Sequence, residues 1–177
     1  MKILGIDPGT ATTGYGVIDS LGNDRYTLID FGLVSTSKDL SHGQRLELIY
    51  DGVSEILERY SPEVVAIERL FFATNALTAI SVGQAIGVIK LAIHRHHVPV
   101  IDYTPMQVKL YVGGSGKADK TLMKMSVKKM LGIRGNKLNE LRDGKTRNKK
   151  QNKTHFDDAA DALALAICHV RRSSVKK

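Results

Sequence analysis

Four acidic residues have the types and spacing that a divalent cation site requires. Asp7 ends a short apolar run at residues 2–6, and Glu68 ends another that begins at residue 63. Asp158 and Asp161 lie three residues apart at the start of the last apolar segment, so on a helix they would share a face. Converging carboxylates repel one another unless a cation lies among them or some of them bind protons. The four residues therefore predict a metal site.

Each acid taken alone also fits an ordinary structural role. Asp7 belongs to an Asp-Pro-Gly turn, and Asp157 and Asp158 suit a helix N-terminus through capping and the macrodipole. Asp161 differs because it lies one turn inside an apolar helix, where capping gives it no role. The conjunction of the four acids, rather than any one of them, favours a chemical role.

Mg²⁺ is the hard, oxygen-preferring cation that such a site would hold, and Mn²⁺ is an expected substitute. Two ions about 3.5–4 Å apart can activate a water and stabilise the leaving oxygen of a phosphodiester. No nucleophilic side chain is needed for that reaction. The acids therefore predict metal-dependent phosphodiester hydrolysis with two ions in each subunit.

The elements that must position these acids follow from hydrophobic periodicity. Strands are expected at residues 2–6, 14–19, 26–35, 63–68 and 98–103. Helices are expected at residues 40–60, 75–94, 121–131 and 158–171. This order predicts an α/β fold with a mixed sheet and helices on its faces. Open α/β sheets place their ligands at the carboxyl edge of the strands, so Asp7 and Glu68 are expected to meet there.

The charge is distributed unevenly along the chain. The formal net charge is +8 and the pI is about 9.6. Residues 1–104 carry 8 Lys/Arg and 12 Asp/Glu, whereas residues 105–177 carry 18 and 6. A basic C-terminal part favours a polyanionic partner such as nucleic acid.

The length fits one domain at residues 1–172, with a basic loop at about 132–156 before the last helix and a basic tail at 173–177. No run reaches about 18 apolar residues and no signal-peptide pattern opens the chain, so a cytoplasmic protein without membrane contact is expected.

The segment GGSGKADK lacks two residue types of a P-loop, because Tyr111 and Ala118 occupy their positions. Nucleotide binding is therefore not expected at that segment.

Three segments resemble the RuvC family of crossover junction endodeoxyribonucleases. They are GIDPGTATTGYGVI near the start, AIERLFFATNALTAISVGQAIGVI in the middle and DDAADALALAICH near the end. The resemblance covers almost the whole chain. It implies a ribonuclease-H-like fold, in which three antiparallel strands precede the parallel ones. It also implies an endonuclease that resolves Holliday junctions by paired, symmetric nicks with 5′-phosphate ends, in recombination and repair.

The resemblance also implies roles for individual residues. The family's acidic positions fall on Asp7, Glu68, Asp158 and Asp161. Asp157 is then an extra carboxylate without an assigned role. The nearby imidazole of His155 also has no assigned role.

Four further residues are expected to contact DNA. The family's stacking aromatic residue falls on Phe71, and its two implicated lysines fall on Lys109 and Lys120. A glycine-rich hinge would bring Lys117 to the DNA backbone beside Lys120.

The resemblance further implies a homodimer that acts on four-way junction DNA with a RuvA/RuvB-type branch-migration complex. The helix at residues 75–94 is the candidate dimer interface, and its alternative is a core helix packed within one subunit. The basic residues at 134–153 are either a solvated loop or an added phosphate clamp.

Three competing functions remain open: another ribonuclease-H-like nuclease, an actin-like ATPase and an inactive binding module. An actin-like ATPase would need far more chain, and an inactive module would not need all four acids.

Overall fold

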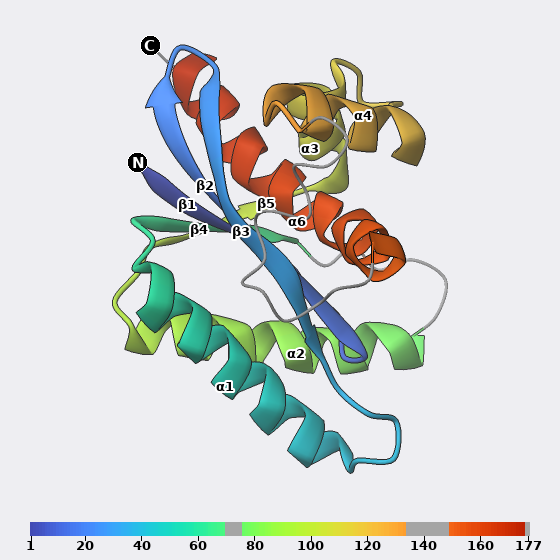
Figure 1. The fold of residues 1–177 in the computed structure, drawn as a ribbon. Helices are drawn as coiled ribbons and strands as arrows, with labels where there is room; N and C mark the ends of the chain where they lie inside the picture. Colours follow the sequence, from blue (N-terminus) through green and yellow to red (C-terminus); the bar gives the residue numbers. More distant parts are fainter. Residues whose placement is uncertain (70–75, 134–148, 176–177) are drawn as a thin grey trace.

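A five-stranded mixed sheet forms the centre of the molecule (Figure 1), in a computed structural model that describes residues 1–69, 76–133 and 149–175. The strands are β1 (Lys2–Asp7), β2 (Thr12–Gly22), β3 (Arg25–Ser35), β4 (Val64–Glu68) and β5 (Val100–Tyr103). The helices are α1 (His42–Tyr60), α2 (Ala76–Arg95), α3 (Pro105–Gly113), α4 (Lys120–Met130) and α6 (Lys149–Val175).

The strands lie in the order β3-β2-β1-β4-β5. The pairs β1/β2 and β2/β3 are antiparallel, whereas β1/β4 and β4/β5 are parallel. This arrangement confirms the predicted α/β class with three antiparallel strands followed by parallel ones. It places the carboxyl ends of β1, β4 and β5 at one edge of the sheet.

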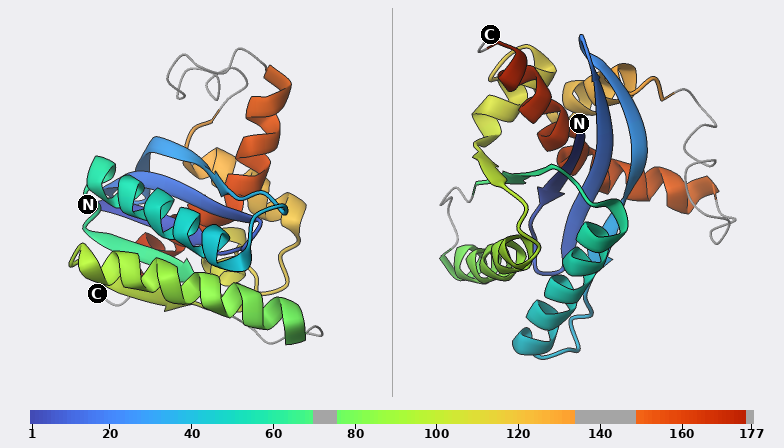
Figure 2. Two further views of the ribbon diagram at one scale, coloured as in Figure 1. Left: turned by 90° about the horizontal axis from the view of Figure 1, so that it is seen from below. Right: turned by 90° about the vertical axis from the view of Figure 1, so that its left-hand side faces the viewer.

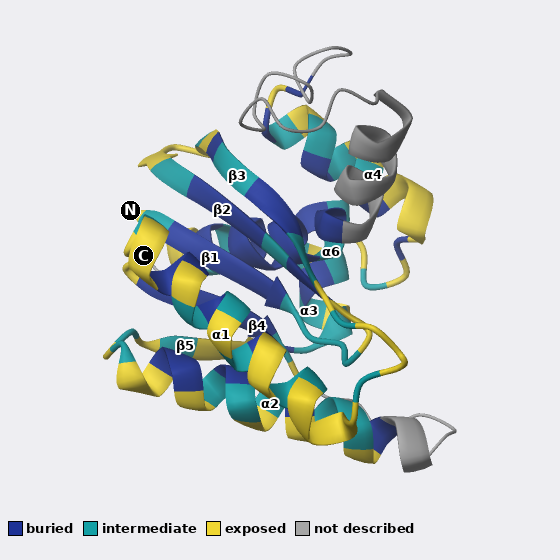
Figure 3. Ribbon diagram, turned by 60° about the horizontal axis from the view of Figure 1, so that its bottom comes forward, coloured by how far each residue is buried: buried dark blue, intermediate teal, exposed yellow. Residues whose placement is uncertain are grey.

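Helices cover both faces of the sheet, as predicted. Helices α1 and α2 lie side by side on one face, and α3, α4 and α6 lie on the other (Figures 1 and 2). Each face has its own apolar cluster, in which alternate residues of a strand point to opposite sides. In β4, for example, Ala66 faces α6 and Ile67 faces the helices α1 and α2. Figure 3 shows that β1 and the middle of β2 are almost wholly buried between the two helical layers.

Two glycines allow α6 to approach the sheet closely. Gly5 of β1 and Gly16 of β2 are partners in the antiparallel ladder. A methyl group at Gly5 would collide with the carbonyl oxygen of Ala162, and one at Gly16 would collide with the Leu163 side chain. The backbone of α6 therefore rests almost directly on β1, one residue beyond Asp161.

Helix α3 was not predicted from the sequence. It begins at Pro105, and the Thr104 side chain accepts a hydrogen bond from the Gln107 backbone N–H while Gln107 caps the Thr104 backbone in return. The helix is only 9 residues long and its apolar residues do not define one face, so periodicity did not reveal it. The capping residues were the available signal.

Helix α6 begins at Lys149, well before the predicted start at Asp158. Residues 149–156, assigned to a basic loop, are therefore helical, and the helix continues through Val175 into the predicted tail. Polar residues dominate this first part of the helix, so an apolar stripe did not mark its beginning. No helix in the described part of the chain is both long and apolar enough to cross a membrane.

Candidate active site

The carboxyl ends of β1 and β4 bring two acids together. The strands pair in parallel with Ile6 opposite Ile67, so Asp7 and Glu68 occupy the next positions on adjacent strands. Their carboxyl groups lie close enough to interact, because the charge of Glu68 raises the pKa of Asp7. A proton on one of the two groups relieves the repulsion between them.

Burial and mutual repulsion hold that proton in place. Burial raises the pKa of Asp7 to about 8, and the negative charge of Glu68 adds to the effect. Burial also raises the pKa of Glu68, and the charge of Asp161 acts in the same direction. At neutral pH the pair therefore keeps a proton unless another positive charge replaces it.

Asp161 reaches the same edge of the sheet from α6. Its Oδ2 atom lies 3.5 Å from Nζ of Lys120, the first residue of α4. Helix α4 starts there because Asp119 caps it, with its side chain accepting a hydrogen bond of 2.8 Å from the Leu122 backbone N–H. The charge of Lys120 lowers the pKa of Asp7, so this ammonium acts on Asp7 as well as on Asp161.

A cavity of about 240 Å³ opens beside the acids. Glu68 and Asp161 supply its acidic edge, and Lys109 and Lys120 supply its basic one. Its other walls come from α3, α4 and α6, through Pro105, Val108, Met123, Ala164 and Leu165. We call this space the lysine cavity. It can bind an anionic group between two ammonium groups while presenting it to carboxylates.

The donor set fits a hard divalent cation. Asp7, Glu68 and Asp161 offer only carboxylate oxygens, and the proton retained by the first two marks a place where positive charge is favoured. Within the described ranges, no three His, Cys, Asp or Glu side chains are already arranged tightly enough to hold a metal ion. Asp161 is instead paired with Lys120. The three acids would have to move together around a cation.

The comparison with known proteins decides the family. Residues 3–143 match the family model described as crossover junction endodeoxyribonuclease RuvC. The chain belongs to the RuvC family. It is 45% identical over 170 residues to the crossover junction endodeoxyribonuclease RuvC of Fusobacterium nucleatum, a match that covers 96% of this chain and 80% of the relative. It is 42% identical to that of Caldicellulosiruptor saccharolyticus, covering 98% and 95% of the two chains.

Solved RuvC structures share the architecture. Thermus thermophilus RuvC in complex with a Holliday junction substrate superposes with a TM-score of 0.83 at 32% identity, covering 99% of this chain and 96% of that one. The structure of the yeast mitochondrial Holliday junction resolvase Ydc2 superposes with a TM-score of 0.68 at 15% identity, covering 97% and 78%. The second likeness concerns the fold alone.

The structure brings together most of the residues expected from the RuvC resemblance. Asp7, Glu68 and Asp161 share the carboxyl edge of the sheet, and Lys109 and Lys120 line the lysine cavity beside them. Lys109 does so from α3, the helix that sequence periodicity missed.

Three expected residues are not placed in this group. Lys117 is exposed in the turn between α3 and α4, where its backbone N–H donates to Oγ of Ser115 at 3.2 Å, and it does not line the lysine cavity. Phe71 lies outside the described residues. Asp158 belongs to α6, but its side chain lies outside the described part of the chain.

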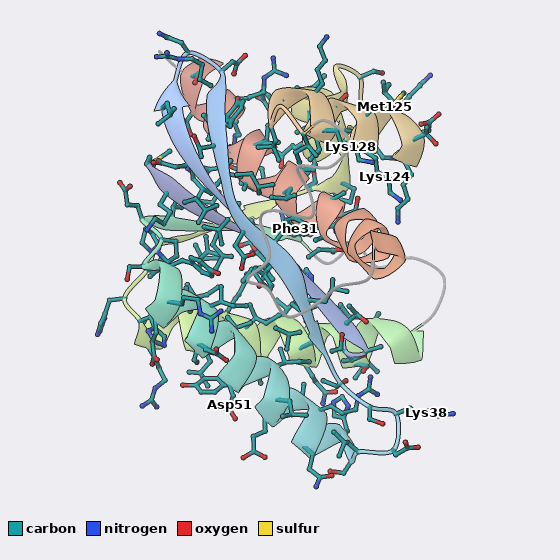
Figure 4. The ribbon with its side chains drawn as sticks, in the orientation of Figure 1. Phe31, Lys38, Asp51, Lys124, Met125 and Lys128 are labelled. Carbon is teal, nitrogen blue, oxygen red and sulfur yellow. The ribbon has the colours of Figure 1, made fainter. Side chains whose placement is uncertain are left out.

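The apolar wall of the lysine cavity was not assigned a role from the sequence. Val108, Met123 and Leu165 come from three different helices, and each is mostly buried. In the sequence they are indistinguishable from other core residues, because only the packing of α3, α4 and α6 brings them beside Glu68. The basic side of the site continues along α4, where Lys124 and Lys128 follow Lys120 at intervals of four residues (Figure 4).

Proposed function

We propose that this RuvC-family chain is an endonuclease that resolves Holliday junctions by paired, symmetric nicks during recombination and repair. The observation that carries the proposal is the cluster of Asp7, Glu68 and Asp161 beside two lysines, at the sheet edge of a chain with RuvC relatives along nearly its whole length. The Thermus thermophilus protein described with a Holliday junction substrate supports the choice of substrate.

Asp7, Glu68, Asp158 and Asp161 are the residues we assign to hold Mg²⁺, two ions in each subunit, with Mn²⁺ as a substitute. When bound, Mg²⁺ would neutralise the acids and offset the charge that develops on the phosphate. The raised pKa of Asp7 supports this assignment because a cation would take the place of its proton.

The chain's own cationic groups position the DNA strand. Lys109 and Lys120 flank the lysine cavity, so a phosphate entering it would receive two ammonium groups next to the acids. Lys117 lies further along the same connection and would contact a neighbouring phosphate. We assign Phe71 to stack on a base, following the family resemblance. Cleavage would leave 5′-phosphate ends.

A homodimer would place two such sites on the two equivalent strands of a junction. Helix α2 supports this arrangement, since Ile80 and Leu91 are 59% and 51% exposed on it. Large apolar side chains at such exposure favour a protein partner over solvent. Light scattering tests the dimer, and a strict monomer at micromolar concentration would contradict it. We also propose a cytoplasmic location and cooperation with a RuvA/RuvB-type complex.

One comparison of substrates tests the proposed activity. The protein is incubated with a four-way junction, a linear duplex and an RNA–DNA hybrid of matched sequence, with Mg²⁺ and with EDTA. We expect symmetric nicks in the junction alone, and only with Mg²⁺. Asp7→Asn is the matched control and should bind the junction without cutting it. Preferential cleavage of the hybrid would instead assign the chain to another ribonuclease-H-like activity.

A further inference from the structure

A second cavity opens at the carboxyl end of β4, on the side of the sheet covered by α2. Its volume is about 550 Å³. Its lining residues come from the ends of β4 and β5 and from α2: Glu68, Arg69, Gly83, Ile86, Lys90 and Asp102. We call this space the arginine groove. Glu68 borders both the arginine groove and the lysine cavity, so the two spaces meet at an active-site carboxylate.

The alternation of side chains along β4 explains why Glu68 reaches the lysine cavity whereas Arg69 does not. Ala66 packs on the α6 side, and Glu68 continues that series into the acidic cluster. Ile67 packs on the α1 and α2 side, and Arg69 continues that series toward α2. The Arg69 backbone is fixed just beyond the strand, because its N–H donates to the carbonyl oxygen of Tyr103 at 2.8 Å. This hydrogen bond ties the backbone of Arg69 to the end of β5.

Among the described residues, hydrogen-bond donors in the arginine groove outnumber the protein acceptors that they contact. Nζ of Lys90 lies 2.7 Å from Oδ1 of Asp102, and the two side chains are 39% and 42% exposed. An ammonium has three N–H donors, so this pair leaves others available. In the described ranges no ion pair or hydrogen bond of the Arg69 guanidinium is found.

An exposed ion pair such as Lys90–Asp102 contributes little to the stability of the fold. Stability therefore does not explain why these charges line the groove. A guanidinium fork and an ammonium that line the same groove are instead suited to a phosphate group. Asp102 would orient Lys90, although its own charge opposes an anion.

We propose that Arg69 and Lys90 form a phosphate-binding subsite for the cleaved DNA strand, on the opposite side of Glu68 from Lys109 and Lys120. The inference rests on the proposed function and extends it. A strand with its phosphate at the acids would continue from the lysine cavity into the arginine groove, with cationic contacts on both sides of the reacting position. The ligand is the sugar-phosphate backbone, so the subsite carries no sequence preference.

Binding measurements with an uncut junction test the subsite. Arg69→Gln, Lys90→Gln and Asp102→Asn are each introduced into the Asp7→Asn protein, and junction affinity is measured over a range of salt concentrations. We expect Arg69→Gln and Lys90→Gln to weaken binding several-fold and each to lower the salt slope by about 0.9 for a lost phosphate contact. Asp102→Asn should tighten binding, because it removes the only acid paired with Lys90 among the described residues.

Arg59→Gln is the matched control. Arg59 is an exposed arginine of α1 paired with Glu55, and α1 ends beside the start of β1, away from the acids. If Arg69→Gln and Lys90→Gln bind as the Arg59→Gln control does, the proposed subsite is wrong. It is also wrong if Lys90→Gln and Asp102→Asn both weaken binding and lower the melting temperature alike, since that pattern denotes a structural ion pair. Failure of the proposed function is separate: the protein with native Arg69 and Lys90 would then not cut junctions at all.

Discussion

Asp7 and Glu68 lie at the ends of two adjacent parallel strands, where burial and the charge of Glu68 raise the pKa of Asp7 to about 8. With no cation between them, the two acids therefore keep a proton at neutral pH. The retained proton makes the stability of the metal-free fold depend on pH. Binding of the cation that we propose for the site should change that stability as well.

Metal-free protein should lose stability as the pH rises from about 5 to about 8. The folded pKa of Asp7 is about 8 and the ordinary pKa of an aspartate is 3.8, so the folded state binds the extra proton within that window. Stability contributed by this proton is complete below the unfolded pKa and is lost as pH rises through the folded one. Melting temperatures in EDTA should fall by several degrees across the window.

Asp7→Asn is the control for that measurement. An amide carries no titrating charge, so the variant should show a flatter pH dependence and a higher melting temperature at about pH 8 in EDTA. Added Mg²⁺ should stabilise the unmodified protein and leave the variant almost unchanged. An identical pH profile for the two proteins would show that the carboxyl pair does not retain its proton.

Asp158 and Asp157 should differ sharply in their effect on cleavage. We expect Asp158→Asn to slow single-turnover cleavage by about 100-fold or more, as for loss of an electrostatic group that acts on the transition state. Asp157→Asn should retain most of the activity. The two substitutions are matched in chemistry and adjacent in the chain, so equal losses would contradict the choice of Asp158 as the ligand.

Lys120 and Lys117 should affect different quantities. Lys120 contacts Asp161 and lines the lysine cavity, so Lys120→Gln should lower the cleavage rate of bound junction. Lys117 is exposed outside that cavity, so Lys117→Gln should weaken binding and flatten its salt dependence while the rate at saturating protein is kept. Single-turnover rates at several protein concentrations separate the two effects.

Gly5→Ala should destabilise the fold by about 3 kcal/mol or more, because the added methyl group collides with the carbonyl oxygen of Ala162. Gly43→Ala is the control, since the space around that glycine near the start of α1 is open. Urea denaturation gives both free energies of unfolding. A small effect at Gly5 would mean that α6 can withdraw from the sheet at little cost.

The sequence predicted the features that depend on local pattern. Apolar runs ending in Asp7 and Glu68 located two strand ends, and the sheet edge then required these acids to meet. The residues that packing alone brings together were not predictable in the same way. Val108, Met123 and Leu165 line one cavity only because three helices converge there.

Arg69 was not assigned a role from the sequence. In the structure it follows Val65 and Ile67 at intervals of two residues, and it lies on the same side of the sheet, toward α2. Its partners in the arginine groove, Lys90 and Asp102, are far apart in sequence, and only the packing of α2 on β5 brings them within 2.7 Å. The alternation of side chains along a strand can be predicted from the sequence. The residues that surround Arg69 cannot.

Gly5 has no functional group, yet it determines the position of Asp161, an acid of the proposed active site. The backbone of α6 touches β1 at Ala162, so the height of Asp161 above the strand ends is fixed by main-chain contact rather than by adjustable side chains. Widening that layer spacing would separate Asp161 from Glu68 while every acid remained in the chain. Variants that are inactive although all their carboxylates are intact should therefore be sought first among the small residues beneath α6. At these residues the main chain sets the distance between α6 and the sheet.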